Sequence, residues 1–316
     1  AQYRAGALHR LRHFKLFRLW RYQRLAVVCK TGLTTRTVPG DSLIWLDGVR
    51  VSSLPLPDRG LEFGDGLFET LLIRGAQPLF LHLHLARLLQ GCTALGFPDC
   101  DDAVRVQLQG ACGEIETRGW AWTAVRVTLT RGAGPRGYAP PQRPTPRIII
   151  SATALAHSSQ DMPAPAAVML SSVRWPSQPM LAGLKHLNRL EQVLAARDYR
   201  DAGHDEAVMQ DQQGRPVSVV AGNLFLVCDG RILTAPLVDC GIAGTRRYLI
   251  MEYWAPALGL AVDEVDLSMA RLETAQEVFY SNSLLGLRPV SALGPHRWSS
   301  HPVCEALYQQ YRGALT

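Results

Sequence analysis

Apolar and polar residues alternate in short runs through the first part of the chain, and the period then changes. Alternation over residues 43–51 and 67–74 predicts two strands, and "RGAQP" supplies the turn into a third at 79–81. Apolar side chains then recur every three or four positions, which predicts an amphipathic helix ended by Gly96. These side chains are Leu85, Leu88, Leu89, Cys92 and Leu95.

The remaining pattern predicts two lobes. A second helix at 101–117, followed by strands at 121–130 and 147–154, makes the first lobe α+β, with bounds 42–156. A stretch rich in Ser, Pro and Ala at 157–167 is the expected linker.

The second lobe is expected over 168–316. It should contain a strand at 168–173, a helix at 189–201 and a hairpin-like run at 206–236. The predicted architecture is therefore a two-domain α/β (α+β) fold. Small ligands commonly bind in the cleft between two such lobes.

The first 40 residues have a composition of their own. They hold nine basic residues and no acid, whereas the rest of the chain holds 24 basic against 27 acidic side chains. The body is mildly acidic, so the net charge of +6 is no sign of nucleic-acid binding. We expect residues 1–41 to lie outside the fold, as a transit peptide, a basic arm or upstream DNA translated through a misplaced start.

The cysteines and the apolar runs indicate the cellular compartment of the protein. The seven cysteines are scattered and form no C-x-x-C pair, which favours a reducing compartment over a disulfide framework. No apolar run approaches the roughly 20 residues that span a bilayer. A cytoplasmic protein without membrane or nucleic-acid partners is expected.

Lysine is rare in this chain. It occurs only at Lys15, Lys30 and Lys185, against 30 arginines. Arginine stays protonated, whereas lysine can lose its proton and form a Schiff base with a carbonyl. Lys185 is therefore the candidate nucleophile, and a surface lysine without function is the alternative.

The surroundings of Lys185 agree with that chemistry. Asn188 is expected to cap a helix, with Glu191 as the capping-box carboxylate, so that Lys185 lies in the turn just before it. The positive end of a helix favours the neutral amine. In "GIAGTRRYL" (241–249), a glycine loop precedes a second helix, whose backbone N–H groups at Thr245 and Arg246 could bind a phosphate.

Several motifs follow one another along the chain. They are "RGLEFGDGLFET" (59–70), "HLARL" (84–88), "RGAGPRGY" (131–138), "GLKHLNRLEQVLAAR" (183–197), "NLFLV" (223–227), "CGIAGTRR" (240–247) and "VFYSNSLLGLRPV" (278–290). In this order they resemble one family, the fold-type-IV pyridoxal phosphate (PLP) enzymes, which includes branched-chain and D-amino-acid aminotransferases and aminodeoxychorismate lyases.

The resemblance implies a role for each matching residue. Lys185 is similar to the lysine that binds PLP as a Schiff base and then moves the proton. Arg87 matches the arginine that binds the cofactor's phosphate, a group that suits the guanidinium fork. Thr245 and Arg246 match the loop whose backbone holds the same phosphate, and Asn223 lies near the cofactor in the family pattern.

One position departs from the family pattern. Five residues before the Asn of "NLF", the family usually has a glutamate that pairs with the protonated pyridine nitrogen of PLP, and here the residue is Ser218. A neutral hydroxyl can donate to an unprotonated nitrogen but cannot hold a proton on it, so the electron sink should be weaker. Either the alignment differs, or the chemistry tolerates a weaker sink, or activity has been lost.

The resemblance is strongest to the lyases, which implies conversion of 4-amino-4-deoxychorismate to 4-aminobenzoate and pyruvate. Arg131 and Arg136 in "RGAGPRGY" could hold a substrate carboxylate. The alternatives are an aminotransferase acting on D-amino or branched-chain acids and a catalytically silent homologue. The family also implies a homodimer whose second subunit completes the site. His82 and His84 are interpreted as structural, since no third metal ligand accompanies them.

Overall fold

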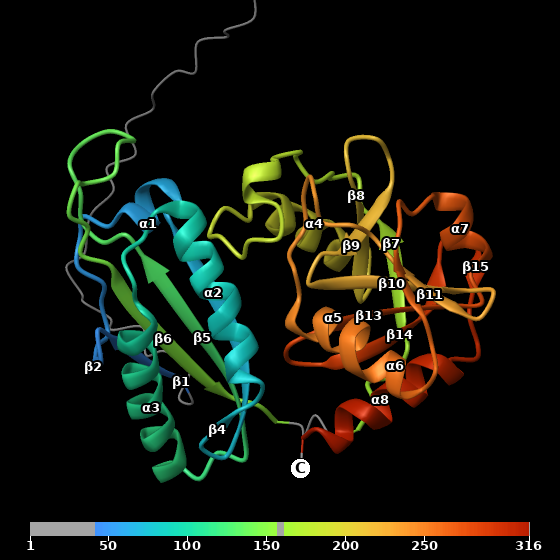
Figure 1. Cartoon of the computed structure of the whole chain (residues 1–316), viewed down its shortest axis with the longest axis horizontal. Helices are drawn as coiled ribbons and strands as arrows, with labels where there is room; N and C mark the ends of the chain where they lie inside the picture. Colours follow the sequence, from blue (N-terminus) through green and yellow to red (C-terminus); the bar gives the residue numbers. More distant parts are fainter. Residues whose placement is uncertain (1–41, 157–160, 316) are drawn as a thin grey trace, which may run out of the picture. The chain divides into compact units, whose positions relative to one another are not determined.

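The structure, a computed structural model, describes residues 42–156 and 161–315 (Figure 1). The basic segment 1–41 and the first part of the expected linker, 157–160, lie outside the described residues, so the predictions for them stay predictions.

The N-terminal lobe is built on a six-stranded antiparallel sheet in the order β2-β1-β6-β5-β3-β4. Its strands are β1 (Ser42–Leu46), β2 (Val49–Arg50), β3 (Gly66–Arg74), β4 (Gln77–Pro78), β5 (Trp122–Thr130) and β6 (Arg147–Ala154). Its helices are α1 (Arg59–Phe63), α2 (Leu81–Leu95) and α3 (Asp101–Thr117). The α+β prediction for this lobe is confirmed.

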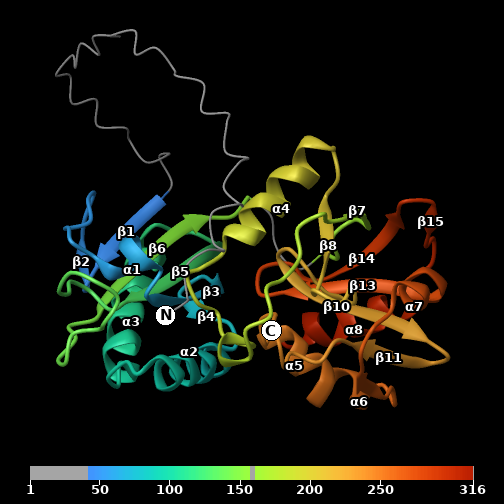
Figure 2. The same ribbon diagram turned by 90° about the horizontal axis from the view of Figure 1, so that it is seen from above.

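Helices α2 and α3 cover the sheet through one apolar core (Figure 2). The predicted stripe of α2 is buried there at Leu85, Leu88 and Cys92, and Gly96 ends the helix in the left-handed conformation (φ 65°). The strand predicted at 79–81 was wrong. Phe80 has φ 55°, so the chain turns after β4 and α2 already begins at Leu81.

The C-terminal lobe is built on a nine-stranded mixed sheet in the order β12-β11-β10-β13-β14-β7-β8-β9, with β15 paired to β14 and β9 also paired to β10. Its strands are β7 (Ala166–Leu170), β8 (Glu206–Gln210), β9 (Pro216–Val219), β10 (Gly222–Cys228), β11 (Arg231–Thr234), β12 (Val262–Glu264), β13 (Glu277–Asn282), β14 (Gly286–Leu293) and β15 (His296–Arg297). The hairpin-like run predicted at 206–236 is therefore four strands, β8 to β11.

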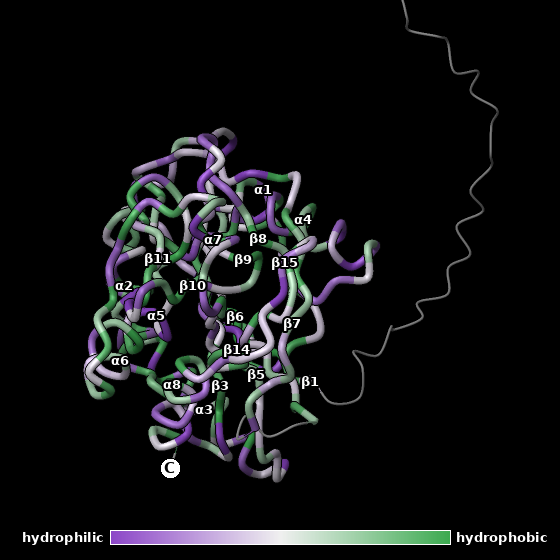
Figure 3. The backbone as a smooth tube through the Cα atoms, turned by 90° about the vertical axis from the view of Figure 1, so that its right-hand side faces the viewer, coloured by the Kyte–Doolittle hydropathy of each residue, from purple (hydrophilic) through white to green (hydrophobic). Residues whose placement is uncertain are grey.

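The helical elements of this lobe are η1 (Pro179–Leu181), α4 (Leu190–Asp201), α5 (Thr245–Leu249), the π-helical turn η2 (Ile250–Trp254), α6 (Ala255–Ala257), α7 (Met269–Thr274) and α8 (Pro302–Gly313). Strand β7 pairs in parallel with both β8 and β14, which makes the sheet mixed. The α/β prediction for this lobe is confirmed. Apolar and polar stretches alternate along the backbone of both lobes (Figure 3), as expected for elements with one buried face.

The two lobes share a core. Leu72 and Trp122 of the first sheet belong to the same apolar cluster as Phe225 and Phe279 of the second, and the rings of these two phenylalanines stack with centroids 4.9 Å apart. The guanidinium of Arg74 donates to the carbonyl of Leu315 at 2.5 Å. This shared packing fixes the geometry of any site to which both lobes contribute. Within the described ranges, no helix combines the length and the apolar character needed to cross a membrane.

Candidate active site

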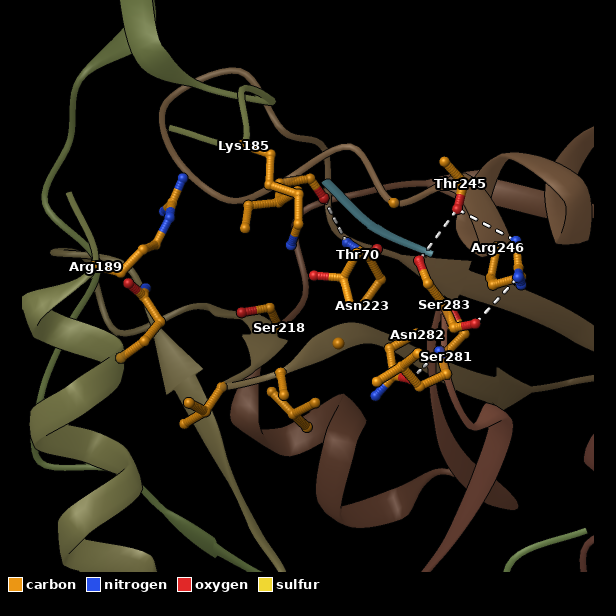
Figure 4. A pocket seen from close by; sticks show the side chains of 18 of the residues that line it. Thr70, Lys185, Arg189, Ser218, Asn223, Thr245, Arg246, Ser281, Asn282 and Ser283 are labelled. Atoms are coloured by element: carbon orange, nitrogen blue, oxygen red, sulfur yellow. Dashed lines mark hydrogen bonds between the residues drawn. The ribbon is translucent and has the colours of Figure 1, made fainter. Parts of the chain in front are cut away.

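A cavity of about 440 Å³ lies where the two lobes meet (Figure 4). Its walls come from β3, α2, the turn before α4, the face of α4, strands β9 and β10, the start of α5 and residues 281–284. The volume is within the range of cofactor and substrate pockets. Lys185, Arg87, Ser218, Asn223, Thr245 and Arg246, which are far apart in the sequence, all line it.

Lys185 lies in a turn that is attached to strand β3. The backbone N–H of Phe68 donates to the carbonyl of Lys185 at 2.9 Å, and the N–H of Leu187 donates to that of Gly66 at 3.0 Å. The amine lies 4.3 Å from the centroid of the Phe68 ring. Burial, with Arg87 the strongest nearby charge, lowers the pKa of Lys185 to about 7. A neutral, nucleophilic amine is therefore present near neutral pH.

The capping box predicted for this turn was wrong. Helix α4 begins at Leu190, and its N-cap residue is Arg189. The amide of Asn188 instead donates to the carbonyl of Gly64 at 3.3 Å. Arg189 holds the turn, because its Nε donates to the carbonyl of His186 at 3.0 Å and its Nη2 to that of Leu184 at 2.9 Å.

Arg87 belongs to a buried cluster with Glu69 and His84. Its Nε and Nη2 donate to the two oxygens of Glu69 at 2.7 and 2.5 Å, and Nδ1 of His84 donates to the same carboxylate at 2.7 Å. Burial alone would raise the pKa of Glu69, but Arg87 and His84 lower it to about 2. Burial lowers the pKa of His84 to about 4, despite the nearby carboxylate. The cluster thus holds one ion pair and a neutral imidazole at neutral pH.

The cluster also reaches the glycine loop. Nη1 of Arg87 donates to the carbonyl of Ala243 at 2.7 Å, which ties α2 to the segment before α5. Asn223 holds the same segment, since its Nδ2 donates to the carbonyl of Ile242 at 2.9 Å. A Cβ at Gly244 would lie 2.0 Å from Oδ1 of Asn223, so only glycine fits there. The loop is therefore fixed from both lobes.

Helix α5 begins at Thr245, directly on the cavity. The first N–H groups of a helix have no partner within it, so those of Thr245 and Arg246 are suited to an anion. Nη2 of Arg246 donates to the carbonyl of Ser283 at 3.1 Å, and the hydroxyls of Thr245 and Ser283 are 3.5 Å apart (Figure 4). Burial lowers the pKa of Arg246 to about 10, with Tyr311 opposing the shift. The guanidinium remains charged at neutral pH.

Ser218 lies on β9, buried in the floor of the cavity and opposite Asn223 of β10. The indole N–H of Trp175 donates to its hydroxyl oxygen at 2.9 Å. That oxygen therefore already accepts one hydrogen bond, and its proton remains available to an acceptor in the cavity.

Arg131, predicted to bind a substrate carboxylate, is not among the residues that line this cavity. Its guanidinium is buried away from the cavity, where it donates to Asp65 at 2.8 Å, to the carbonyl of Gly96 at 3.0 Å and to that of Leu95 at 2.8 Å. It holds the end of α2 rather than a ligand. Arg136 is exposed and also lies outside the residues that line this cavity, so a role for it in the site of its own chain is not supported.

Sequence reasoning missed part of the cavity wall. Thr70 of β3 follows Glu69 and faces the cavity, as does the polar run 281–283 at the end of β13. The signal for Glu69 was present as an acid inside the apolar run "GLFETLL", because an ionised side chain is rarely buried without a partner.

Comparison with known proteins defines the class. Residues 66–293 match the family described as Amino-transferase class IV, and the chain belongs to this family. Its fold is that of the fold-type-IV PLP enzymes, and members of the family bind PLP.

Several of the similar proteins carry the name of a lyase. The chain is 32% identical to an aminodeoxychorismate lyase of Vibrio harveyi, over 79% of this chain and 91% of the relative. The crystal structure of 4-amino-4-deoxychorismate lyase from Pseudomonas aeruginosa superimposes on this chain with a TM-score of 0.80. The two sequences are 42% identical, and the match covers 86% of this chain and 98% of the lyase. A putative branched-chain-amino-acid aminotransferase of Methanocaldococcus jannaschii is 28% identical over 74% of this chain and 80% of the relative.

Proposed function

We propose that this chain is a PLP-dependent lyase that converts 4-amino-4-deoxychorismate to 4-aminobenzoate and pyruvate. The observation that carries the proposal is the 42% identity to a lyase of known structure over nearly the full length of that protein. The site adds a neutral amine at Lys185 beside a cavity with anion-binding groups at one end.

The residues at that end suit the phosphate of PLP. The N–H groups that open α5, the hydroxyls of Thr245 and Ser283, and the guanidinium of Arg87 border one part of the cavity. Arg87 uses three of its five N–H groups on Glu69 and Ala243, so two are free for a further acceptor. When bound, PLP supplies an electron sink for the electrons left on a carbon that loses its proton.

Lys185 has two tasks in this proposal. If PLP is bound, the neutral amine of Lys185 would hold it through its aldehyde group, and with substrate present Nζ would accept the proton of the amine-bearing carbon. Departure of the enolpyruvyl group makes the ring aromatic, and the departing enolpyruvate takes up one proton to become pyruvate. The low pKa of Lys185 lets the same atom accept and return a proton near pH 7.

Ser218 supports elimination over amino transfer. With Trp175 donating to its oxygen, the hydroxyl can donate its proton to an unprotonated pyridine nitrogen but cannot keep a proton on that nitrogen. A weaker sink suffices where aromatisation drives the reaction. Amino transfer receives no such help.

The direct test is to add 4-amino-4-deoxychorismate to the purified, PLP-loaded protein and follow 4-aminobenzoate and pyruvate in parallel. We expect equal amounts of both products, and borohydride reduction followed by peptide mapping should label residues 183–189. Rapid conversion of PLP to pyridoxamine phosphate by D-alanine or branched-chain amino acids, without 4-aminobenzoate, would establish the aminotransferase instead. If the protein consumes neither 4-amino-4-deoxychorismate nor an amino donor, it is a catalytically silent homologue.

Ser218→Glu tests the part played by the hydroxyl. A carboxylate at this position should protonate the pyridine nitrogen and speed the conversion of PLP to pyridoxamine phosphate by an amino donor. We expect about tenfold or more, because one pKa unit corresponds to about 1.4 kcal/mol. Stopped-flow absorbance measures the rate, and Ser218→Ala is the matched control. Equal rates in Ser218→Glu and wild type, with the glutamate variant folded and PLP-loaded, would refute this role.

A further inference from the structure

The cavity has a second end that the proposed cofactor does not explain. Figure 4 shows Arg189 on the opposite side of Lys185 from Thr245 and Arg246. Helix α4 lines this end with one face, because the contributing positions recur at helical spacing. They are Arg189, Gln192, Val193, Ala196 and Tyr199.

Arg189 carries a charge that no carboxylate neutralises. Among residues 42–156 and 161–315, no Asp or Glu lies within ion-pair distance of its guanidinium. The guanidinium lies over the ring of Trp175, with Cζ 5.7 Å from the centroid, and donates to two backbone carbonyls, while Nη1 has no hydrogen-bond partner in those residues. Burial lowers the pKa of Arg189 to about 10, with Glu191 opposing and Arg87 adding to the shift. A charged group is thus held partly out of water beside an open cavity.

Gln192 lies one turn along the same face of α4. Its side chain is only 9% exposed, and within the described part of the chain neither its amide nitrogen nor its amide oxygen has a hydrogen-bond partner. An amide buried in this way costs free energy until a partner arrives. Gln192 is one of the residues that line the cavity, so a ligand in the cavity could supply the missing hydrogen-bond partner.

Helix α4 adds to the attraction for an anion. No side chain caps its first turn, so the N–H groups that follow Arg189 keep their partial positive charge. The pairing of the charged residues on the cavity wall also favours an anion at this end. Arg87 is paired with Glu69, and Arg246 would belong to the phosphate site, whereas Arg189 has no counter-ion among the residues that the structure describes.

We infer that Arg189 and Gln192 form a carboxylate-binding subsite, which receives a carboxylate of the substrate while its amine lies at Lys185. A guanidinium offers a planar fork for a carboxylate, and an amide N–H adds a third donor. The inference rests on the proposed function for the choice of ligand. The chemistry of the subsite selects a planar, carboxylate-bearing substrate over its uncharged analogue.

The test compares two probes of nearly the same shape, 4-aminobenzoate, which carries a carboxylate, and 4-aminobenzamide, which carries an uncharged amide. Calorimetric titration of the PLP-loaded protein gives a dissociation constant for each, and we expect wild type to bind the carboxylate at least about tenfold more tightly. Arg189→Leu should bring the ratio close to one. Arg197→Leu is the matched control, since Arg197 lies on the same helix with its side chain 63% exposed, and it should leave the ratio unchanged.

A second variant is needed, because Arg189→Leu also removes the hydrogen bonds that hold the Lys185 turn. Gln192→Leu leaves Arg189 in place and should lower the ratio severalfold, with the absorbance of bound PLP unchanged. Equal binding of both probes to wild type, or a ratio that neither Arg189→Leu nor Gln192→Leu changes, overturns the subsite. If the ratio depends on both residues but no 4-aminobenzoate is formed from 4-amino-4-deoxychorismate, the subsite stands and the lyase proposal fails.

Discussion

Two of the clusters of arginine and carboxylate in the N-terminal lobe, one around Asp65 and one around Glu69, differ in what surrounds them. In one, Asp65 binds Arg59 and Arg131, and both guanidiniums spend their other donors on backbone carbonyls. In the other, Glu69 binds Arg87 and His84, and Arg87 borders the cavity together with Lys185. The first cluster secures the loop after β5 and the end of α2. The second borders the cavity.

The difference shows how to separate a structural arginine from a functional one. Both types are buried, paired and hydrogen-bonded, so burial and ion pairing do not distinguish them. What distinguishes them is whether the guanidinium lines the cavity. Arg131 and Arg87 each donate from Nε, Nη1 and Nη2 to protein acceptors, but of the two only Arg87 is among the residues that line the cavity.

The largest effect that separates the clusters is expected from Glu69→Gln. The substitution leaves the guanidinium of Arg87 buried without its counter-ion, so we expect a loss of about 3–5 kcal/mol in the free energy of unfolding. It should also weaken PLP binding at least about tenfold, since Arg87 loses its orientation. Urea unfolding and equilibrium titration with PLP measure the two effects.

Asp65→Asn is the matched variant in the other cluster. The side chain of Asp65 is 15% exposed, so water compensates part of the loss and we expect about 1–2 kcal/mol. Its affinity for PLP should stay within about twofold of wild type. A drop in PLP affinity as large as that of Glu69→Gln would show that the two clusters do not differ in function.

A smaller effect should appear in the pH dependence of PLP capture. Because the pKa of Lys185 is lowered from its usual 10.5 to about 7, the amine is neutral in the folded protein above pH 7. The unfolded chain still binds that proton up to about pH 10.5, so this group makes the folded state more stable as pH rises from 7 to 10.5. The rate of PLP capture, followed by stopped-flow absorbance, should rise with pH and level off above about 7.

The two clusters should differ in their effect on the pH midpoint of the PLP-capture rate. Glu69 raises the pKa of Lys185, so Glu69→Gln should move the midpoint to lower pH. Asp65→Asn should not move it. A rate that keeps rising through pH 9 in wild type would show that the amine is not desolvated as the structure has it.

Much of the site was predictable because its residues belong to local sequence patterns. The rarity of lysine marked Lys185, and collinear motifs marked Arg87, Asn223, Thr245 and Arg246, which the structure brings to one cavity. Their roles, the homodimer and the cytoplasmic location stay predictions. The α+β and α/β lobes followed from hydrophobic periodicity.

The rest depended on contacts between distant segments. Asn188 has the sequence context of a helix cap, yet the carbonyl of Gly64, 124 residues away, takes its amide. Arg131 lies in a glycine-rich segment that looks exposed, but Asp65 and the end of α2 bury it. Neither Gln192 nor the Trp175–Ser218 bond has a signal in sequence spacing, because the packing of distant segments decides which side chains meet.

The apolar cluster that contains Leu72 and Trp122 along with Phe225 and Phe279 has a consequence for how the molecule comes apart. Neither sheet can open without exposing rings and aliphatic side chains of the other to water, so the lobes should lose structure together in a single cooperative step. Backbone amides of β3 and β10 would then exchange with solvent only through global opening. The cavity therefore exists only while both lobes are folded. A ligand that contacts both lobes should raise the free energy of unfolding of the whole protein rather than of one lobe.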